Sequence, residues 1–440
     1  MTRHTIQVGN TNLPHGILIL AESLPNRDGV RAGDEVVFAF SGTDYVNLPG
    51  LVLLATWRKS LPPNVSARID DSRCTFPAQN LLSNSGFREI VETGHEAPSA
   101  QRRSGRLPIR PLTNRLNHDA AVQDVTSVFE ETADHVSDVK SVKTIISELC
   151  ENALTHSEFA SPSYVSARAQ EQVDQRRLEI ALCDSGIGIR ESYLTGTNEE
   201  AKERIARGAD PIDLAVSGQN SSRPIPRAGE YRSNMGLGLF ITRRLVEENR
   251  GQLMIVSQRD AIHCVGHISR NTYTLRNAFP GTFVVALLDP DNPLPLEEVY
   301  EEATRSVVGD MPGLTVSKGV AKESPPQPVG ASTAAPTMNG RNGIPAQPGV
   351  LALRYFGTEL LTRDVGLAIR AELATRLVQH GSVSVDLDGI SDITPSVADE
   401  VFGKLALALG MERFAKVVLL RGGSSLARRL IEFVVKNRVK

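Results

Sequence analysis

The sequence has no long apolar run, no large net charge and no signal region at its start. None of its apolar stretches approaches the roughly 20 residues that cross a bilayer, and the N-terminus lacks a basic-then-apolar pattern. We therefore expect a cytoplasmic protein without a membrane partner. The formal net charge of −3 gives no reason to expect nucleic acid as a partner.

Cysteine pairs and a Walker motif are also missing. The cysteines at positions 74, 150, 183 and 264 are widely spaced and form no Cys-x-x-Cys pair, which favours buried, reduced thiols. The sequence contains no Gly-x-x-x-x-Gly-Lys, which excludes a Walker-type NTPase.

The length of 440 residues is too great for one core and predicts roughly two to four domains. We expect a small α/β domain at 1–100, a linker at 101–114, a larger domain at 115–295, a second linker at 296–349 and a small α/β domain at 350–440. The second linker is rich in Pro, Ala and Gly from residue 323, which is typical of a flexible tether.

Strand and helix patterns alternate in residues 1–100, which favours helices packed on a parallel or mixed sheet. We expect strands at Gly16–Leu20, Val36–Phe40 and Val65–Ile69, and helices at Leu48–Leu61 and Asn80–Thr93.

A helical pattern from about Val136 to Phe159 holds the most informative polar residues. Glu148, Asn152 and His156 are each four apart, so they share one helix face opposite an apolar stripe. A carboxylate beside an amide could bind a hydrated magnesium ion and deprotonate a water molecule. An ordinary solvated polar face of the helix explains the same three residues equally well.

Two glycine-rich segments follow this helix. Asp184 ends the predicted strand Leu178–Cys183 and is followed by Gly186 and Gly188, which let backbone approach a flat ligand while the carboxylate accepts from an amine. Further on, Asn234-Met-Gly-Leu-Gly238 opens an amphipathic helix, whose free N–H groups favour phosphate oxygens. A Rossmann site is excluded because no strand immediately precedes the glycines and their spacing differs.

These three segments, in this order, resemble the GHKL superfamily of ATP-binding domains found in gyrases, heat-shock chaperones, mismatch-repair proteins, histidine kinases and anti-sigma kinases. Gly281-Thr282-Phe283 resembles the closing Gly-Thr strand of that family, and the resemblance covers roughly residues 115–290. It implies an α/β sandwich that holds Mg²⁺ and ATP beneath a mobile lid.

The resemblance also implies roles for individual residues. Glu148 would be the catalytic base, and Asn152 would coordinate Mg²⁺. Asp184 would recognise adenine, which Thr282 would contact through water. The nucleotide pocket would be shaped by Gly186, Gly188, Asn234, Gly236, Leu237 and Gly238. His156 has no implied chemistry and is expected to be a polar helix-end residue.

The predicted lid lies between the two glycine segments. It begins with a helix at Glu199–Gly208 and continues as an irregular stretch with Arg223, Arg227 and Arg232. These arginines are interpreted either as ligands of the γ-phosphate or as solvated loop residues.

The segment Val385–Glu400 is similar to the STAS-like domains attached to GHKL ATPases, over residues 350–440. It places Ser396 where related domains carry a phosphoacceptor. The alternative is that Thr394 and Ser396 only cap a helix, with Asp399 completing a capping-box-like pair. A fainter STAS resemblance at Phe40–Leu51 has no serine at the corresponding helix start.

The predicted fold is therefore α/β, an α+β sandwich of GHKL type flanked by two small α/β STAS-like domains.

The first functional hypothesis is an ATPase whose lid closure switches interactions between the STAS-like domains and a protein partner. The second is an anti-sigma-type serine/threonine kinase that acts on a STAS-like partner or on its own C-terminal domain. The third is a non-catalytic scaffold holding nucleotide. Assembly as a homodimer fits each hypothesis. A sensor histidine kinase is disfavoured because His118-Asp119 lacks the pattern of a phosphoacceptor helix.

Overall fold

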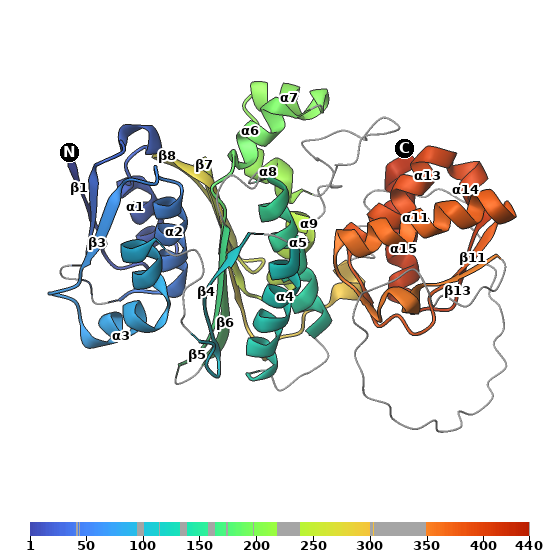
Figure 1. Ribbon diagram of the computed structural model, residues 1–440, viewed down its shortest axis with the longest axis horizontal. Helices are drawn as coiled ribbons and strands as arrows, with labels where there is room; N and C mark the ends of the chain where they lie inside the picture. The colour runs from blue at the N-terminus through green and yellow to red at the C-terminus, as the bar shows by residue number, and fades with distance from the viewer. Residues whose placement is uncertain are drawn as a thin grey trace.

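The structure, a computed structural model, describes residues 1–40, 43, 45–94, 101–113, 115–132, 139–156, 163–172, 175–196, 198–217, 238–299, 302 and 349–439. We refer to residues 1–94, 101–299 and 349–439 as the N-terminal, central and C-terminal domains. The three domains follow one another along the long axis of the molecule (Figure 1). No helix in the described ranges is long and apolar enough to cross a membrane.

The N-terminal domain contains a three-stranded parallel sheet in the order β1-β2-β3. Its elements are β1 (Arg3–Gln7), α1 (His15–Ser23), η1 (Arg27–Gly29), β2 (Glu35–Ala39), α2 (Leu48–Lys59), β3 (Ser66–Asp70), α3 (Phe76–Asn84) and the π-helical turn η2 (Glu89–Thr93). Asn47 caps α2 by accepting from the Gly50 N–H at 3.0 Å, which confirms the predicted helix start.

Two predicted elements of this domain are wrong in type or extent. Gly16–Leu20 was expected to be a strand and lies in α1, because a short apolar run is compatible with either structure. The helix expected at Asn80–Thr93 is broken at Ser85 and Gly86, where the backbone of Gly86 is left-handed at φ +82°. It resumes as η2 and ends at Gly94, which is also left-handed, as its position predicts.

The central domain contains a five-stranded antiparallel sheet in the order β4-β5-β6-β8-β7. Its elements are β4 (Arg106–Leu112), α4 (Arg115–Glu130), α5 (Val139–His156), β5 (Ser163–Gln172), β6 (Gln175–Cys183), α6 (Gly188–Thr195), α7 (Glu199–Ala206), α8 (Pro211–Val216), α9 (Gly238–Glu248), β7 (Gln252–Val265) and β8 (Ser269–Leu288). The expected linker at 101–114 is wrong over residues 106–112, because they form the edge strand β4.

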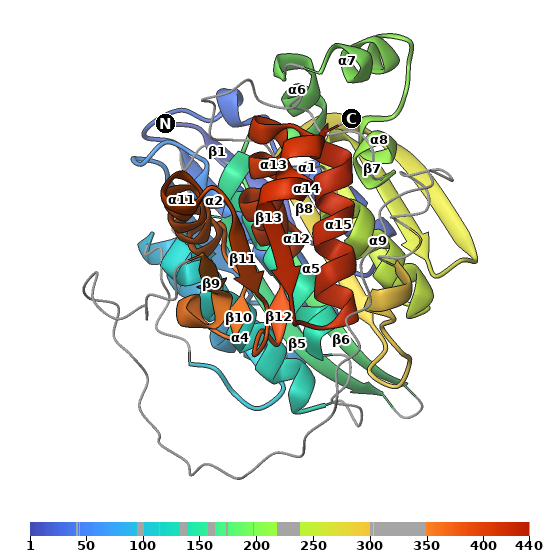
Figure 2. The same ribbon diagram turned by 90° about the vertical axis from the view of Figure 1, so that its right-hand side faces the viewer.

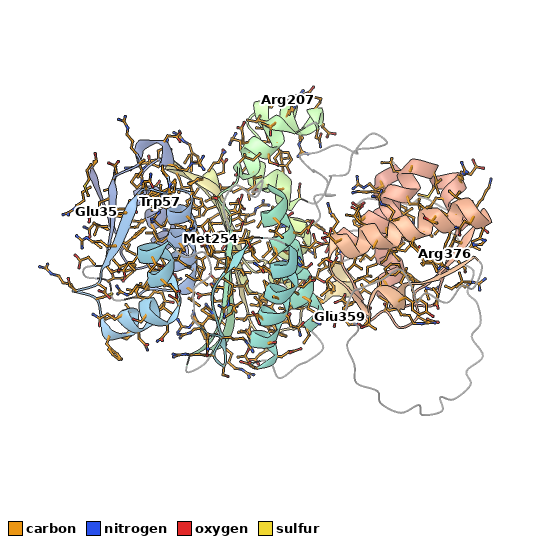
Figure 3. The ribbon with its side chains drawn as sticks, viewed as in Figure 1. Glu35, Trp57, Arg207, Met254, Glu359 and Arg376 are labelled. Carbon is orange, nitrogen blue, oxygen red and sulfur yellow. The ribbon has the colours of Figure 1, made fainter. Side chains whose placement is uncertain are left out.

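Both faces of this sheet are covered. Helices α4, α5 and α9 pack on one face, and α1 and α2 of the N-terminal domain pack on the other (Figure 1). Residues 48–58 of α2 are all buried, as a helix with apolar residues on every side requires. Trp57 of α2 and Met254 of β7 belong to the same apolar cluster, so the N-terminal domain and the sheet share one core (Figure 3).

The C-terminal domain contains a three-stranded parallel sheet in the order β13-β11-β9 and a two-stranded parallel sheet of β10 and β12. Its elements are β9 (Val350–Ala352), η4 (Leu353–Phe356), β10 (Glu359–Leu360), α11 (Arg363–His380), β11 (Val383–Asp386), β12 (Asp392–Ile393), α12 (Pro395–Ala398), the π-helical turn η5 (Asp399–Gly403), α13 (Lys404–Leu409), α14 (Met411–Val417), β13 (Val418–Arg421) and α15 (Ser425–Val439). In Figure 2, α11 is drawn to the left and α15 to the right of strands β11 and β13.

The predicted start of α12 is confirmed in part. Thr394 is the N-cap, with Oγ1 accepting from the Val397 N–H at 3.4 Å, and Pro395 is the first helical residue. Asp399 does not complete a capping box. Its carboxylate instead pairs with the Arg438 guanidinium, whose Nε lies 2.6 Å from Oδ1, and both side chains are buried.

Candidate functional site

Helix α5 positions the first group of candidate residues. Its apolar stripe, which includes Val142, Ile145 and Leu149, is buried in the central core. Glu148 projects from another face of the helix and is only 5% exposed, while Asn152 one turn later is partly buried. The side chain of His156 lies outside the described residues.

Glu148 is held by the C-terminal domain. Its Oε1 accepts from the Ser396 hydroxyl at 2.9 Å and from the Ser396 backbone N–H at 3.3 Å. Burial raises the pKa of Glu148 to about 7, although the Ser396 hydroxyl and the nearby Arg363 act against that rise. A carboxyl group with a pKa near neutrality can take up and release a proton under physiological conditions.

The start of α9 approaches the same carboxylate from the other side. A Cβ on Gly238 would lie 2.6 Å from Glu148 Oε2 and 3.2 Å from Asn152 Nδ2, so only glycine allows this approach without displacement. The structure therefore brings Glu148, Asn152 and Gly238 together. The other residues expected in this segment, Asn234, Gly236 and Leu237, lie outside the described residues.

Asp184 organises a second group at the end of β6. Its Oδ1 accepts from the Gly186 N–H at 2.8 Å and from the Thr282 N–H at 3.2 Å. Burial raises the pKa of Asp184 to about 7, although both N–H groups act against that rise. Among the residues that the structure describes, none donates to Oδ2. This oxygen is thus available to a donor on a ligand, as recognition of an amine requires.

The glycine turn after Asp184 is fixed by β7. Gly188 has a left-handed backbone at φ +78°, and a Cβ there would lie 2.8 Å from Gln258 Cγ. The Ser257 hydroxyl accepts from the Ile189 N–H at 2.8 Å and lies 3.2 Å from Thr282 Oγ1. Asp184, Gly186, Gly188 and Thr282 therefore belong to one hydrogen-bonded unit.

Sequence reasoning missed Ser257, which joins the glycine turn to the strand carrying Thr282. The available signal was its chemistry, because it is the polar residue that ends the buried run Leu253–Val256. A buried hydroxyl at such a position needs hydrogen-bond partners, so its presence indicates that another segment of the chain contacts the strand there.

Sequence reasoning also missed the docking of the C-terminal domain on α5. Lys143 Nζ lies 2.7 Å from Glu359 Oε1, and the Ser147 hydroxyl donates to the Leu361 carbonyl at 3.1 Å. Figure 3 shows Glu359 at the junction of the two domains. The available signal was a polar row on α5, since Lys143, Ser147 and Glu151 are each four apart.

Glu151 and Arg363 form the most buried ion pair of this interface. Their closest atoms are 3.4 Å apart, and each side chain is 6% exposed. Arg363 also lies 3.9 Å from Glu400, which pairs with Arg370 at 3.0 Å and with Lys404 at 2.5 Å. A chain of alternating charges thus runs from α5 into the interior of the C-terminal domain.

Within the described ranges, no three His, Cys, Asp or Glu residues are grouped so that they could hold a metal ion. The amide of Asn152 fits the requirements of Mg²⁺, which binds through few protein oxygens and keeps several waters or phosphate oxygens. Such an ion would supply positive charge to offset that of bound phosphates.

Comparison with protein families identifies one match, to the histidine kinase-, DNA gyrase B- and HSP90-like ATPases, over residues 137–287. No curated protein matches the chain. The family match contains α5, Asp184, the glycine turn and Thr282, and it leaves all of the N-terminal and C-terminal domains outside. Residues 137–287 are therefore a GHKL-type ATP-binding domain.

Proposed function

We propose that the chain is a signalling ATPase in which Mg-ATP controls how the C-terminal domain is seated on the ATP-binding domain. The supporting observation is the hydrogen bond from Ser396 to Glu148 at 2.9 Å. Glu148 occupies the position of the catalytic base in the family resemblance. The residue that would serve ATP chemistry is thus also the residue that holds the C-terminal domain.

Because Glu148 takes part in both, it couples nucleotide binding to docking of the C-terminal domain. Any change in charge or protonation at Glu148 on nucleotide binding alters the strength of its bond to Ser396. Thermodynamic linkage makes the effect mutual, so docking must alter nucleotide affinity by the same factor. Because Glu148 is 5% exposed, water screens this coupling only weakly.

Asn152 and Gly238 support placing the phosphate end of the nucleotide beside Glu148. Asn152 is the expected magnesium ligand. Helix α9 begins at Gly238, where a Cβ atom would lie only 3.2 Å from the Asn152 amide nitrogen. The N-terminus of an eleven-residue helix favours anions at this point. Asp184 would hold the base end through its available oxygen, Oδ2.

The same geometry supports a second candidate, a kinase that modifies its own Ser396. The Ser396 hydroxyl donates directly to Glu148, which is the arrangement of a nucleophile and its general base. In this reaction Glu148 takes the hydroxyl proton, the serine oxygen bonds to the γ-phosphorus of ATP, and ADP leaves. The products are phosphoserine and ADP.

A labelling experiment separates these functions. Full-length protein is incubated with Mg²⁺ and γ-labelled ATP beside Asn152→Ala, Glu148→Gln and Ser396→Ala, with Ser382→Ala as an exposed control. Free phosphate that is released by the parent and by Ser396→Ala, and lost in Glu148→Gln, supports the ATPase switch. Label retained on the parent and lost in Ser396→Ala supports the kinase.

Two results would contradict the proposal more deeply. Nucleotide that binds and is neither hydrolysed nor transferred would support the scaffold hypothesis instead. A parent protein that does not bind ATP would contradict every version, and calorimetric titration with the non-hydrolysed analogue of ATP tests this point separately from turnover.

A further inference from the structure

A pocket of about 460 Å³ lies at the junction of the N-terminal and central domains, away from Glu148 and Asp184. Its lining includes Asn80 and Asn84 of α3, together with Arg103 and Arg106 at the start of β4 and Arg168 within β5. We call this feature the arginine pocket. In Figure 1, α3 and β5 lie in the lower part of the view, and the helices α6 and α7 lie at the top.

The three arginines are gathered by the strand register. Arg106 and Arg168 are directly opposite each other on the antiparallel strands β4 and β5, so their side chains leave the same face of the sheet. Arg103 is joined to Arg106 by a backbone bridge across a tight turn. Like charges placed directly opposite destabilise a sheet, and burial together with Arg168 and Arg103 lowers the pKa of Arg106.

Nearby carboxylates do not neutralise this cluster. Glu131, which also lines the pocket, is paired with Arg102 and accepts from the Gly105 N–H at 2.6 Å. Within the described part of the chain, no carboxylate lies within ion-pair distance of Arg106 or Arg168. Glu179, opposite Arg168 in β6, has a pKa that burial raises to about 7 although Arg168 acts against that rise, so it offsets only part of the charge of the cluster. The pocket lining, with three arginines and the single carboxylate of Glu131, therefore carries net positive charge.

We propose that the arginine pocket binds a small phosphate ester that carries hydroxyl groups. Guanidinium groups match phosphate oxygens in bidentate pairs, and two of them on adjacent strands can hold one phosphate group. The Asn80 amide nitrogen can donate to a sugar oxygen, and the Thr132 hydroxyl, which donates to the Val128 and Phe129 carbonyls, can accept from a sugar hydroxyl. No aromatic ring lines the pocket, so the lining offers no stacking surface for a base, and a sugar phosphate is favoured over a nucleotide.

The ligand would join two domains, because Asn80 and Asn84 belong to the N-terminal domain and the arginines to the central domain. A hydrogen bond from Arg103 Nη2 to Asn84 Oδ1 at 3.1 Å already links the two sides. Binding would offset the repulsion between Arg106 and Arg168, so it would raise the stability of the folded chain. This proposal does not depend on the activity of the ATP-binding domain.

Calorimetry and thermal unfolding of the full chain test the proposal, with ribose 5-phosphate and inorganic phosphate as probes. We expect saturable binding of ribose 5-phosphate to the parent and at least about tenfold weaker binding to Arg106→Gln and Arg168→Gln. Affinity should be unchanged in Arg207→Gln, an exposed arginine directly after helix α7 (Figure 3), and in Asn152→Ala, which tests for binding at the ATP site instead.

The unfolding temperature gives a second measurement. If the two arginines had only a structural role, added ligand would not raise the unfolding temperature of the parent. Without ligand, Arg106→Gln should unfold at the same temperature as the parent or at a higher one, because the substitution removes the like-charge contacts with Arg168 and Arg103. Added ribose 5-phosphate should stabilise the parent and not this variant. Absence of binding to the parent, equal affinity in the arginine variants, or equal affinity for inorganic phosphate and the ester would each overturn the assignment.

Discussion

Replacing Ser396 by Ala tests how the C-terminal domain is held on α5. The Ser396 hydroxyl donates to Glu148 Oε1 at 2.9 Å, and both side chains are buried. At about pH 8, where Glu148 is mostly ionised, a hydrogen bond to its carboxylate contributes about 1.5–3 kcal/mol, and the buried carboxylate cannot replace the lost donor with bulk water. The variant should therefore weaken docking while leaving the fold of each domain intact.

The remaining contacts set the size of this effect. The Ser396 N–H still reaches Glu148 at 3.3 Å, and Lys143–Glu359 and Glu151–Arg363 are untouched. We therefore expect a loss near the lower end of the range, about 1.5–2 kcal/mol. Such a loss makes separation of the C-terminal domain from α5 about ten- to thirtyfold more frequent, because about 1.4 kcal/mol corresponds to a factor of ten.

Hydrogen exchange on the nucleotide-free full chain measures this directly. Amides in α5 and α12 should exchange about ten- to thirtyfold faster in Ser396→Ala than in the parent, while amides of α2 should be unchanged. Ser382→Ala is the matched control, since it makes the same chemical change at an exposed position of the same domain. Protection of α5 that is the same in both variants would refute the view that Ser396 holds the domain.

Three further predictions address other parts of the molecule. Gly238→Ala should weaken ATP binding at least about tenfold in calorimetry, because its Cβ would lie 2.6 Å from Glu148 Oε2; Gly9→Ala, which meets only open space, should not. Arg363→Met should lower the free energy of unfolding by about 3–5 kcal/mol in guanidinium titrations by leaving Glu151 buried and unpaired, and adding Glu151→Gln should restore much of it. Fluorescence of Trp57, the single tryptophan, should change together with the far-ultraviolet circular dichroism on unfolding, because α2 shares its core with the central sheet; an earlier fluorescence change would contradict a shared core.

Local chemistry explains which parts of the fold could be predicted. The start of α12 was correctly placed because Thr394 and Pro395 favour a helix start whatever surrounds them. The type of α1 was wrong because its four apolar residues fit a buried strand as well as a helix, and the choice depends on neighbours from distant sequence. Strand β4 was missed because its prolines and arginines suggest a linker, although an edge strand tolerates proline.

The candidate site also contains features that the local sequence indicates and features that depend on distant residues. Asp184 and Gly188 were singled out because a carboxylate at a strand end and a glycine turn leave a trace in the local sequence, whereas Thr282 was expected only from the family resemblance. The contact between Glu148 and Ser396 joins residues that are 248 positions apart, so no pattern within either segment could indicate it. What the sequence did place correctly was each partner on its own helix, at a position where its side chain was suited to chemistry or capping.

Glu148 also gives the protein a pH dependence whose direction follows from its burial. Burial raises its pKa from 4.5 to about 7. A base must be deprotonated to act, so turnover should rise as the pH passes through about 7 and then level off. Stability changes in the opposite direction, because between these two pKa values the folded chain keeps a proton that the unfolded chain has lost. From about pH 6 to about pH 8 this group should lower the free energy of unfolding by about 1.4 kcal/mol. Guanidinium titrations at both pH values measure the loss, and Glu148→Gln, which cannot titrate there, should lose less by that amount. Equal losses in the parent and Glu148→Gln would show that the pKa of Glu148 is not raised. The proposal that Glu148 is a base that titrates near neutral pH would then be wrong.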